Sequence, residues 1–519
     1  MPPWPGSLAD ESMPTRDAKA RSTVKSQQKL AAAASASPAI LMASGGDKRI
    51  WLDSVSGRNR YGTLTRPAED EISFSSSTAS SPSALAFAAA TQSLSRLINP
   101  AAAGAVTYDV WFNQLHQHIA AALGCAGART ILASSGTDAE LLGLGIVSAL
   151  SPRPLTNVFV APDETGNGVP QAAAGRHFSD ITALGLAVQP GEEIAGLAAE
   201  RIEARAIAIR DEAGRQRAAV DIDADMIATV EGELKKGRDV VVHVLDTSKT
   251  GLTGVTRDAA KYAASLAPGR VRVMIDACQL RGEIDDLRDD LANGFIVLVT
   301  VSKFFAAPPF AGALLLPDDI VAQLRGASFP PGLLDYTAAQ DWCPSLRDEL
   351  KIDFTTEMNI GLGLRWQAGL ANLQRFNAIP PTMAAQIKRE FVDAIRKRAF
   401  GEDGFFIHPD DDGCHLESRA IVNLSVTSEE QSSMVRAKAV QEQLRQAAGA
   451  VCHVGQPVRV ANRAVLRVAL SAPHVIAVSE RLALGDGLPA AMAPLVSQLD
   501  TLFEKWQQIH QGLALSDAS

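Results

Sequence analysis

The sequence predicts an α/β protein whose large domain is built on a mostly parallel, seven-stranded-type sheet sandwiched by helices, with a smaller C-terminal α/β domain behind it. Two observations carry this prediction. From about residue 100 onward, short apolar and β-branched runs alternate with segments of helical spacing. Such short runs are typical of strands buried on both faces. Strands that alternate with helices favour βαβ units and therefore a parallel sheet.

The composition narrows the class of protein. The chain has 519 residues, of which 46% are hydrophobic and 21% are charged, and its formal net charge is -9. An acidic balance disfavours a general nucleic-acid binder, because phosphate binding needs a basic surface. The five cysteines are far apart, which argues against a disulfide scaffold and fits a reducing compartment. No apolar run approaches the roughly 20 residues that span a bilayer. We therefore expect a cytoplasmic enzyme without a metal, nucleic-acid or membrane partner.

The N-terminal hundred residues differ in character from the rest. Residues 1–45 are rich in Pro, Ser, Lys and Ala, and we expect a flexible tail there. No apolar stretch follows a basic start, which argues against a secretory signal. Residues 46–99 are expected to pack on the large domain. Their serine cluster around Ser76 either covers the substrate side or is an ordinary loop.

The strands and helices can be placed in order. The large domain is expected over residues 100–357, with strands at 130–133, 157–161, 240–245, 271–275, 295–301 and 312–316. Residues 358–519 are expected to form a linking helix over 358–376 and the small domain. Apolar stripes at helical spacing predict helices at 138–150, 383–398 and 429–447. Strands of the small domain are predicted at 420–426 and 450–454.

Polar residues follow five of the predicted strands, and ligands of parallel sheets bind beyond the carboxyl ends of strands. Any one cluster alone is explained by a loop or a helix cap. Five clusters at five strand ends indicate a shared site. They are Ser135, Gly136 and Thr137; Asp163, Glu164 and Thr165; Asp246, Thr247 and Ser248; Asp276 and Gln279; and Ser302 and Lys303.

Three of these clusters suit one cofactor. The helix start at Ser135 offers N–H groups and a positive dipole end to a phosphate. Asp276 and Lys303 end neighbouring strands, where a carboxylate and a lysine are costly unless they are paired or functional. Pyridoxal 5'-phosphate would use all three features: the lysine forms its Schiff base and the acid keeps the pyridine nitrogen protonated. The alternative is a buried structural ion pair between Asp276 and Lys303.

The motifs here resemble those of fold-type I pyridoxal-phosphate-dependent enzymes, in particular the aminotransferase class V group that includes cysteine desulfurases. The segment from Asp276 to Gln279 is similar to the Asp-Ala-x-Gln of that family, and Ser302-Lys303 with the Pro- and Gly-rich 308–314 is similar to its lysine strand. The resemblance covers roughly residues 100–475. It implies that Asp276 binds the ring nitrogen, Gln279 the ring hydroxyl, Ser302 the phosphate and Lys303 the aldehyde.

Other segments extend the resemblance. Residues 133–138 resemble the phosphate loop, and 243–251, with Asp246 and Ser248, resemble a segment beside the ring. Residues 354–360 are similar to a Gly-Thr-x-Asn motif, which implies that Thr356 reaches the phosphate of a neighbouring subunit in a homodimer with shared active sites. Residues 465–471 resemble the strand whose arginine, here Arg467, clamps the substrate α-carboxylate. The ring that usually stacks on the cofactor is missing, and Thr165 takes its place.

The resemblance implies action on a small α-amino acid through an external aldimine, with amino-group transfer as the leading hypothesis. The alternative is a lyase or decarboxylase, favoured by the missing aromatic ring and the lack of a mobile thiol. Cys414 precedes a predicted strand and Cys452 lies on one, which is unsuitable for a desulfurase nucleophile. A third hypothesis, a catalytically silent binding scaffold, is disfavoured because the chain has both Lys303 and Asp276.

Overall fold

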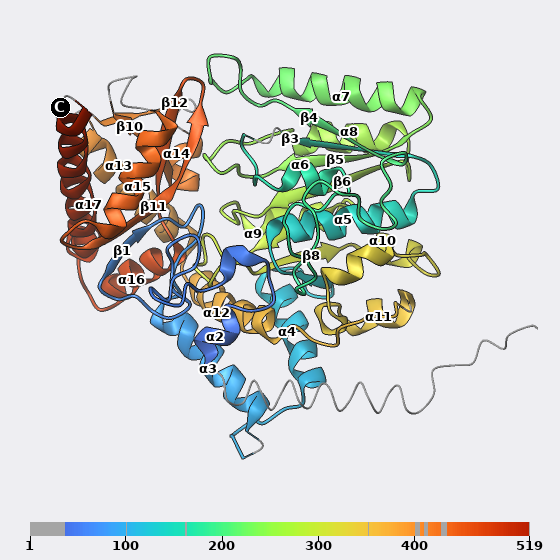
Figure 1. Cartoon of the computed structure of the whole chain (residues 1–519), viewed down its shortest axis with the longest axis horizontal. Coiled ribbons are helices and arrows are strands. Elements are labelled where there is room, and N and C mark those ends of the chain that lie inside the picture. Colours follow the sequence, from blue (N-terminus) through green and yellow to red (C-terminus); the bar gives the residue numbers. More distant parts are fainter. Residues whose placement is uncertain are drawn as a thin grey trace, which may run out of the picture.

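The computed structural model describes residues 37–99, 101–160, 163–350, 352–399, 405–408, 414–426 and 433–517. They form two sheets that lie side by side, with helix α12 and the N-terminal segment passing between them (Figure 1). The predicted tail, residues 1–45, lies largely outside the described residues.

The larger sheet has seven strands and is mostly parallel, as predicted. Its strand order is β2-β8-β7-β6-β5-β3-β4, and β8 runs antiparallel to both of its neighbours. The sequence did not reveal β4, because this edge strand is half exposed and lacks a continuous apolar run. The strands are β2 (Arg129–Ala133), β3 (Leu155–Val160), β4 (Ile202–Ile207), β5 (Asp239–Leu245), β6 (Val271–Ala277), β7 (Ile296–Thr300) and β8 (Gly312–Leu316).

Helices cover both faces of this sheet, because its central strands are apolar on both sides. Helix α5 is buried almost along its whole length and packs on one face with α6, α10 and α11. The other face carries α3, α4, α7, α8, α9 and α12. These helices are α3 (Ala84–Ile98), α4 (Tyr108–Ala122), α5 (Gly136–Leu150), α6 (Val169–Ala173), α7 (Ala219–Lys235), α8 (Arg257–Leu266), α9 (Ile284–Ala292), α10 (Asp318–Gln323), α11 (Pro344–Leu350) and α12 (Ile360–Asn377).

The smaller sheet has the strand order β1-β11-β12-β10-β9. Its strands are β1 (Glu71–Phe74), β9 (Phe405–Ile407), β10 (Ile421–Val426), β11 (Val451–Val460) and β12 (Arg463–Ala469). The helices of this part are α13 (Pro381–Ala399), α14 (Cys414–Arg419), α15 (Met434–Gln446), α16 (Ala472–Ala483) and α17 (Leu488–Asp517). Three single turns, η1 (Lys48–Ile50), η2 (Pro331–Asp335) and η3 (Ala339–Asp341), lie in the connections.

The N-terminal segment 46–99 differs from the prediction that it packs on the large domain. Strand β1 pairs in parallel with β11 of the smaller sheet. Ile72 and Phe74 alternate inward there, and Phe74 contacts Phe391 and His474 in the core of the small domain. Only α3, farther along the segment, joins the core of the large domain. The segment therefore bridges the two domains.

Residues 37–45 also differ from the predicted tail. They form α2 (Pro38–Met42) and a following loop. Arg365 of α12 is completely buried and donates hydrogen bonds to the carbonyl oxygens of Met42, at 3.0 Å, and Gly45, at 2.7 Å. Because a buried guanidinium needs acceptors, these carbonyls fix the segment against the linking helix.

None of the helices in the described ranges has both the length and the apolar character needed to cross a membrane.

We expect Phe74→Ala to destabilise the protein by about 3–5 kcal/mol, because it leaves a cavity in a fully packed core. Urea unfolding of the variant and the parent protein measures the difference. Phe406→Ala serves as the control, since the Phe406 side chain is 43% exposed, and its effect should stay below about 1 kcal/mol. Equal losses in the two variants would show that β1 is not part of the small-domain core.

Candidate functional site

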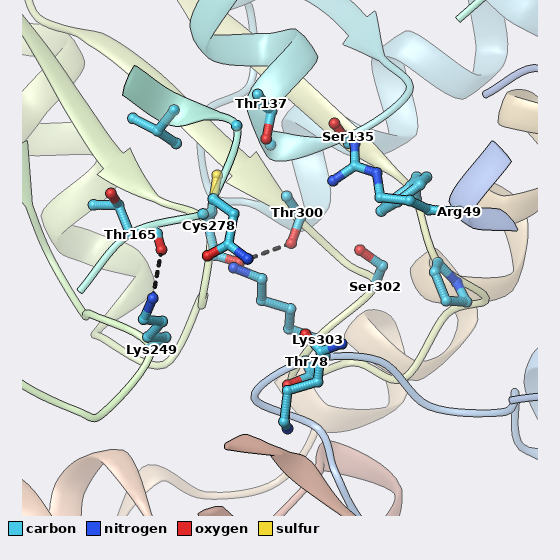
Figure 2. A pocket seen from close by; sticks show the side chains of 18 of the residues that line it. Arg49, Thr78, Ser135, Thr137, Thr165, Lys249, Cys278, Thr300, Ser302 and Lys303 are labelled. Atoms are coloured by element: carbon cyan, nitrogen blue, oxygen red, sulfur yellow. Dashed lines mark hydrogen bonds between the residues drawn. The ribbon is translucent and has the colours of Figure 1, made fainter. Parts of the chain in front are cut away.

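A cavity of about 660 Å³ opens at the carboxyl ends of the central strands, between the large domain, the small domain and the N-terminal segment. Figure 2 shows Lys303, Ser302, Thr300 and Cys278 around it, together with Ser135 and Thr137 at the start of α5. Most of the predicted site residues line this one cavity: Ser135, Gly136, Thr137, Thr165, Asp276, Gln279, Ser302, Lys303 and Arg467.

Asp276 and Lys303 reach the cavity from adjacent strands. Asp276 lies on β6 opposite Leu298 of β7, and Lys303 follows β7 by three residues. The Asp276 carboxylate accepts a hydrogen bond from the backbone N–H of Cys278 at 3.0 Å. Within the described part of the chain Asp276 and Lys303 form no ion pair, so the structural alternative weighed for them is not realised. Both side chains remain available to a ligand between them.

The start of α5 forms the wall that suits an anion. The Ser135 hydroxyl accepts from the backbone N–H of Asp138 at 3.1 Å and caps the helix. The other N–H groups of a first helical turn have no acceptor within the helix and carry the positive dipole end. Gly136 allows the start of α5 to pack closely against Cys278, because a Cβ at this position would lie 2.9 Å from the Cys278 sulfur. Burial and the charge of Asp47 raise the pKa of Asp138 to about 7, which reduces its repulsion of an anion.

Three residues that line the cavity have a buried polar atom without a partner. Thr165 Oγ1, Gln279 Oε1 and Ser77 Oγ are buried and have no hydrogen-bond partner in the protein, and all three residues line the cavity. Buried polar groups are normally paired. These three atoms therefore indicate a polar ligand that supplies the missing partners.

Arg467 provides a buried positive charge. Its guanidinium donates to the carbonyl oxygens of Gln456, at 2.8 Å, and Lys249, at 2.9 Å, and to the Thr78 hydroxyl at 2.8 Å. These acceptors are neutral, and no carboxylate among the described residues forms an ion pair with Arg467. Burial lowers the pKa of Arg467 to about 10. An anionic ligand would supply the missing counter-charge.

Lys249 is a second amine in the cavity, and the sequence reading gave it no role. Its ammonium donates to the Thr165 carbonyl at 3.0 Å (Figure 2). Burial, and then the charge of Arg467, lower the pKa of Lys249 to about 8. A detectable fraction of this amine is therefore neutral near physiological pH.

Arg49 is another cavity residue that the sequence reading missed. Its guanidinium pairs with the Asp47 carboxylate at 2.6 Å and lies 4.5 Å from the centre of the Phe310 ring. Figure 2 places it beside Ser135. No local signal could have revealed it, because the N-terminal segment reaches the helix start only in the folded chain.

Four predicted site residues do not line the cavity. Asp246 pairs with Arg257 at 3.2 Å, and Ser248 donates to Glu164 at 2.6 Å. Ser76 donates to the Leu470 carbonyl at 2.7 Å and accepts from Arg281. The backbone of Thr356 accepts from Ala339 at 2.9 Å. The loop after β5 turns Asp246 toward Arg257 and Ser248 toward Glu164. These two residues therefore follow a strand but do not reach the cavity.

A buried pair lies behind Asp276. Glu140 of α5 and His243 of β5 are 3.2 Å apart, between Oε2 and Nδ1. Burial, and then the charge of Asp276, raise the pKa of Glu140 to about 8, and burial lowers the pKa of His243 to about 3. At neutral pH we therefore assign a neutral carboxyl group that donates to a neutral imidazole. This pair keeps a second negative charge away from Asp276.

Four of the five cysteines are buried free thiols in the structure. Cys125, Cys278, Cys343 and Cys452 are free and buried. Cys452 lies on β11, as the strand prediction required, and burial raises the pKa of its thiol and of the Cys278 thiol. Cys414 begins α14. Buried protonated thiols are poor nucleophiles.

The comparisons with known proteins bear on the fold. No protein-family model and no curated protein matches this sequence. Among solved structures, a NifS-like protein is similar, with a TM-score of 0.52 and 11% identity over 85% of this chain and 99% of that one. A phosphoserine aminotransferase from Cytophaga hutchinsonii has a TM-score of 0.51 and 12% identity over 84% and 99% of the two chains.

These likenesses confirm the predicted fold class. The chain has the fold of the fold-type I pyridoxal-phosphate-dependent transferases, with its seven-stranded sheet and a smaller second domain. The narrower class V assignment does not follow from them.

We expect the Glu140→Gln variant to have a flatter dependence of stability on pH. Folded Glu140 retains its proton up to a pKa of about 8, against 4.5 for an ordinary glutamate. The folded state therefore binds more protons between these two values, and the free energy of unfolding falls as the pH rises through this window. The glutamine variant lacks this loss, which amounts to a few kcal/mol.

Urea unfolding at a series of pH values from 5 to 9 measures this pH dependence of the free energy of unfolding. The variant Glu200→Gln, at an exposed position, is the matched control. Parallel pH curves for Glu140→Gln and the parent protein would contradict the assignment of a neutral Glu140.

Proposed function

We propose that this protein is a pyridoxal 5'-phosphate-dependent enzyme of the aminotransferase class V type that transfers the amino group of a small α-amino acid. One observation carries the proposal: a single cavity in this fold brings together Lys303, Asp276 and the anion-binding start of α5. When bound, the cofactor supplies an aldehyde that captures the amino group and a ring that accepts electrons from the Cα bond that breaks.

The residues present fit this cofactor. Lys303 would tether it covalently, and the Asp276 carboxylate would hold its ring nitrogen protonated. Its phosphate would occupy the α5 start together with Ser302. Gln279 Oε1 and Thr165 Oγ1 are two of the buried atoms that lack a partner in the protein, and we assign them to the ring hydroxyl and the ring face.

The remaining side chains handle the substrate. Arg467 would bind the α-carboxylate through its planar fork of donors. The carboxylate would supply the negative charge that the neutral acceptors around Arg467 do not provide. Lys303, once free, would move the proton at Cα, since a lysine amine in a desolvated site serves as a general base. Lys249 is a second amine in the cavity, and it lies close enough to Lys303 for their charges to interact.

A lyase or decarboxylase remains the second candidate. The observation that favours it is the threonine, Thr165, at the place where aminotransferase relatives carry an aromatic ring over the cofactor. The orientation of the substrate at Cα decides which bond breaks. The silent-scaffold hypothesis is disfavoured, because Lys303 and Asp276 face one cavity without neutralising each other.

We also propose a cytoplasmic homodimer with shared active sites. The similarity of residues 354–360 to a motif that reaches a neighbouring subunit supports this proposal. Sedimentation velocity of the purified protein tests it, and a monomer at micromolar concentration would contradict it.

The Lys303→Ala variant should lose covalent attachment of the cofactor. The parent protein, loaded with pyridoxal 5'-phosphate and treated with borohydride, should gain one cofactor mass on a peptide that contains Lys303. The variant should show no gain there, and its activity should fall at least about a thousandfold, because the same amine tethers the cofactor and moves the proton.

Lys249→Ala is the matched control for attachment, since Lys249 lies in the same cavity. Retained attachment in Lys303→Ala together with its loss in Lys249→Ala would move the tether to Lys249 and overturn the assignment.

The two reaction types give different products. Amino-group transfer predicts that the loaded enzyme converts a suitable amino acid to its 2-oxo acid only as long as a second 2-oxo acid is supplied, with one amino group transferred for each one lost. Chromatography of both acids measures this ratio. Release of carbon dioxide, or of ammonia together with a 2-oxo acid, without an amino acceptor would instead establish the decarboxylase or the lyase.

A further inference from the structure

A side pocket of about 50 Å³ lies between the N-terminal segment and the small domain. It shares four lining residues with the large cavity: Arg60, Tyr61, Thr78 and Gln456. The two spaces are therefore neighbours separated by these side chains. The volume of the side pocket is sufficient for an anionic head group of a few atoms.

Two arginines line this side pocket. Arg60 comes from the loop before β1, and Arg445 comes from the last turn of α15. Within the described residues, neither guanidinium forms a hydrogen bond or an ion pair. Burial lowers the pKa of Arg445, and the charge of Glu442 opposes this shift only in part. Two unpaired guanidinium groups at one small pocket repel each other unless an anion joins them.

The loop before β1, which carries Arg60, lies close to the Arg445 side chain. Gly62 has φ +78°, and a Cβ there would lie 2.9 Å from Cδ and 3.0 Å from Nε of Arg445. Asn59 holds the loop by a 2.8 Å hydrogen bond from its side chain to the Thr63 hydroxyl. The glycine therefore makes room for Arg445 beside the segment that carries Arg60.

The nearby acidic groups do not neutralise the pair. Glu71 contacts Arg58 and binds His453 at 2.9 Å. Although burial opposes the shift, the hydrogen bonds from His453 and Arg58 lower the pKa of Glu71 to about 2. Glu442 is exposed and lies on the same helix as Arg445. The positive charge of the side pocket therefore exceeds the negative charge around it.

The position relative to Arg467 links this pocket to the substrate. The Thr78 hydroxyl accepts from Arg467 at 2.8 Å and from the backbone N–H of Gln456 at 3.2 Å. Thr78 and Gln456 thus touch Arg467 and also line the side pocket. The side pocket therefore lies just beyond Thr78 and Gln456 from the guanidinium that would bind the substrate α-carboxylate.

We propose that Arg60 and Arg445 form a subsite for a second anionic group, so that the substrate is an α-amino acid with an acidic side chain. This inference rests on the proposed function and specifies its substrate class. Arginine suits the role, because its fork of donors binds carboxylate and phosphate groups in two-pronged fashion.

Titration calorimetry of the cofactor-loaded protein tests the subsite without turnover. Glutarate and valerate have the same carbon chain and lack an amino group, but only glutarate has a second carboxylate. Glutarate should bind at least about tenfold more tightly than valerate. Arg445→Met and Arg60→Met should each bring the affinity for glutarate close to that for valerate and leave valerate unchanged. Arg459→Met, an exposed arginine of β11, should retain the preference.

Turnover provides the second readout. The kcat/KM for glutamate should exceed that for norvaline by about tenfold or more, and the two arginine variants should remove this preference. Comparison of O-phosphoserine with glutamate distinguishes a phosphate from a carboxylate as the preferred group. Because Arg60 is exposed, its variant tests the subsite even if Arg445→Met fails to fold.

Equal binding of glutarate and valerate to the parent protein overturns the subsite. If such a protein still attaches the cofactor at Lys303 and reacts with neutral amino acids, the proposed function stands alone. A protein that takes up no cofactor overturns the proposed function, and it is recognised by the missing mass gain rather than by these affinities.

Discussion

The parallel alignment of β5, β6 and β7 is the constraint on which the site depends. Because these strands run in one direction, the residues that follow them emerge at the same edge of the sheet. Asp276 and Lys303 meet there at the cavity, and the start of α5 faces them. The apolar strands behind them remove water from this edge, which makes each unpaired charge costly and a ligand of matching charge favourable.

Arginine side chains without an ionic partner are the second recurring feature. Arg467 is surrounded by carbonyl oxygens, and Arg60 and Arg445 have no ionic partner among the described residues. Glu140 is also buried, but it avoids an unpaired charge by retaining its proton, so it adds no negative charge behind Asp276. The cavity thus combines the Asp276 carboxylate with the cations of Lys249, Lys303 and Arg467 in its wall. This distribution fits a cofactor with a cationic ring nitrogen and an acidic substrate.

The N-terminal segment is structurally important for both domains. Its β1 strand completes the smaller sheet, α3 packs on the large domain, and the loop between η1 and β1 carries Arg60 and Tyr61 to the cavity. The carbonyls before η1 bind Arg365 of the linking helix. The N-terminal segment contacts both domains and also lines the site. The shape of the cavity therefore depends on how the two domains pack.

The sequence by itself determined the fold class and the residues that directly follow strands. Apolar β-branched runs and the polar residues after them are local features, so Ser135, Asp276 and Lys303 could be assigned from their neighbours in the chain. The same rule was wrong for the position of Asp246 and Ser248, because the course of a loop after its strand depends on partners such as Arg257 and Glu164 that are distant in sequence. Strand β1, Arg49 and the arginines of the side pocket depended on tertiary structure alone, since their roles arise from contacts between segments hundreds of residues apart.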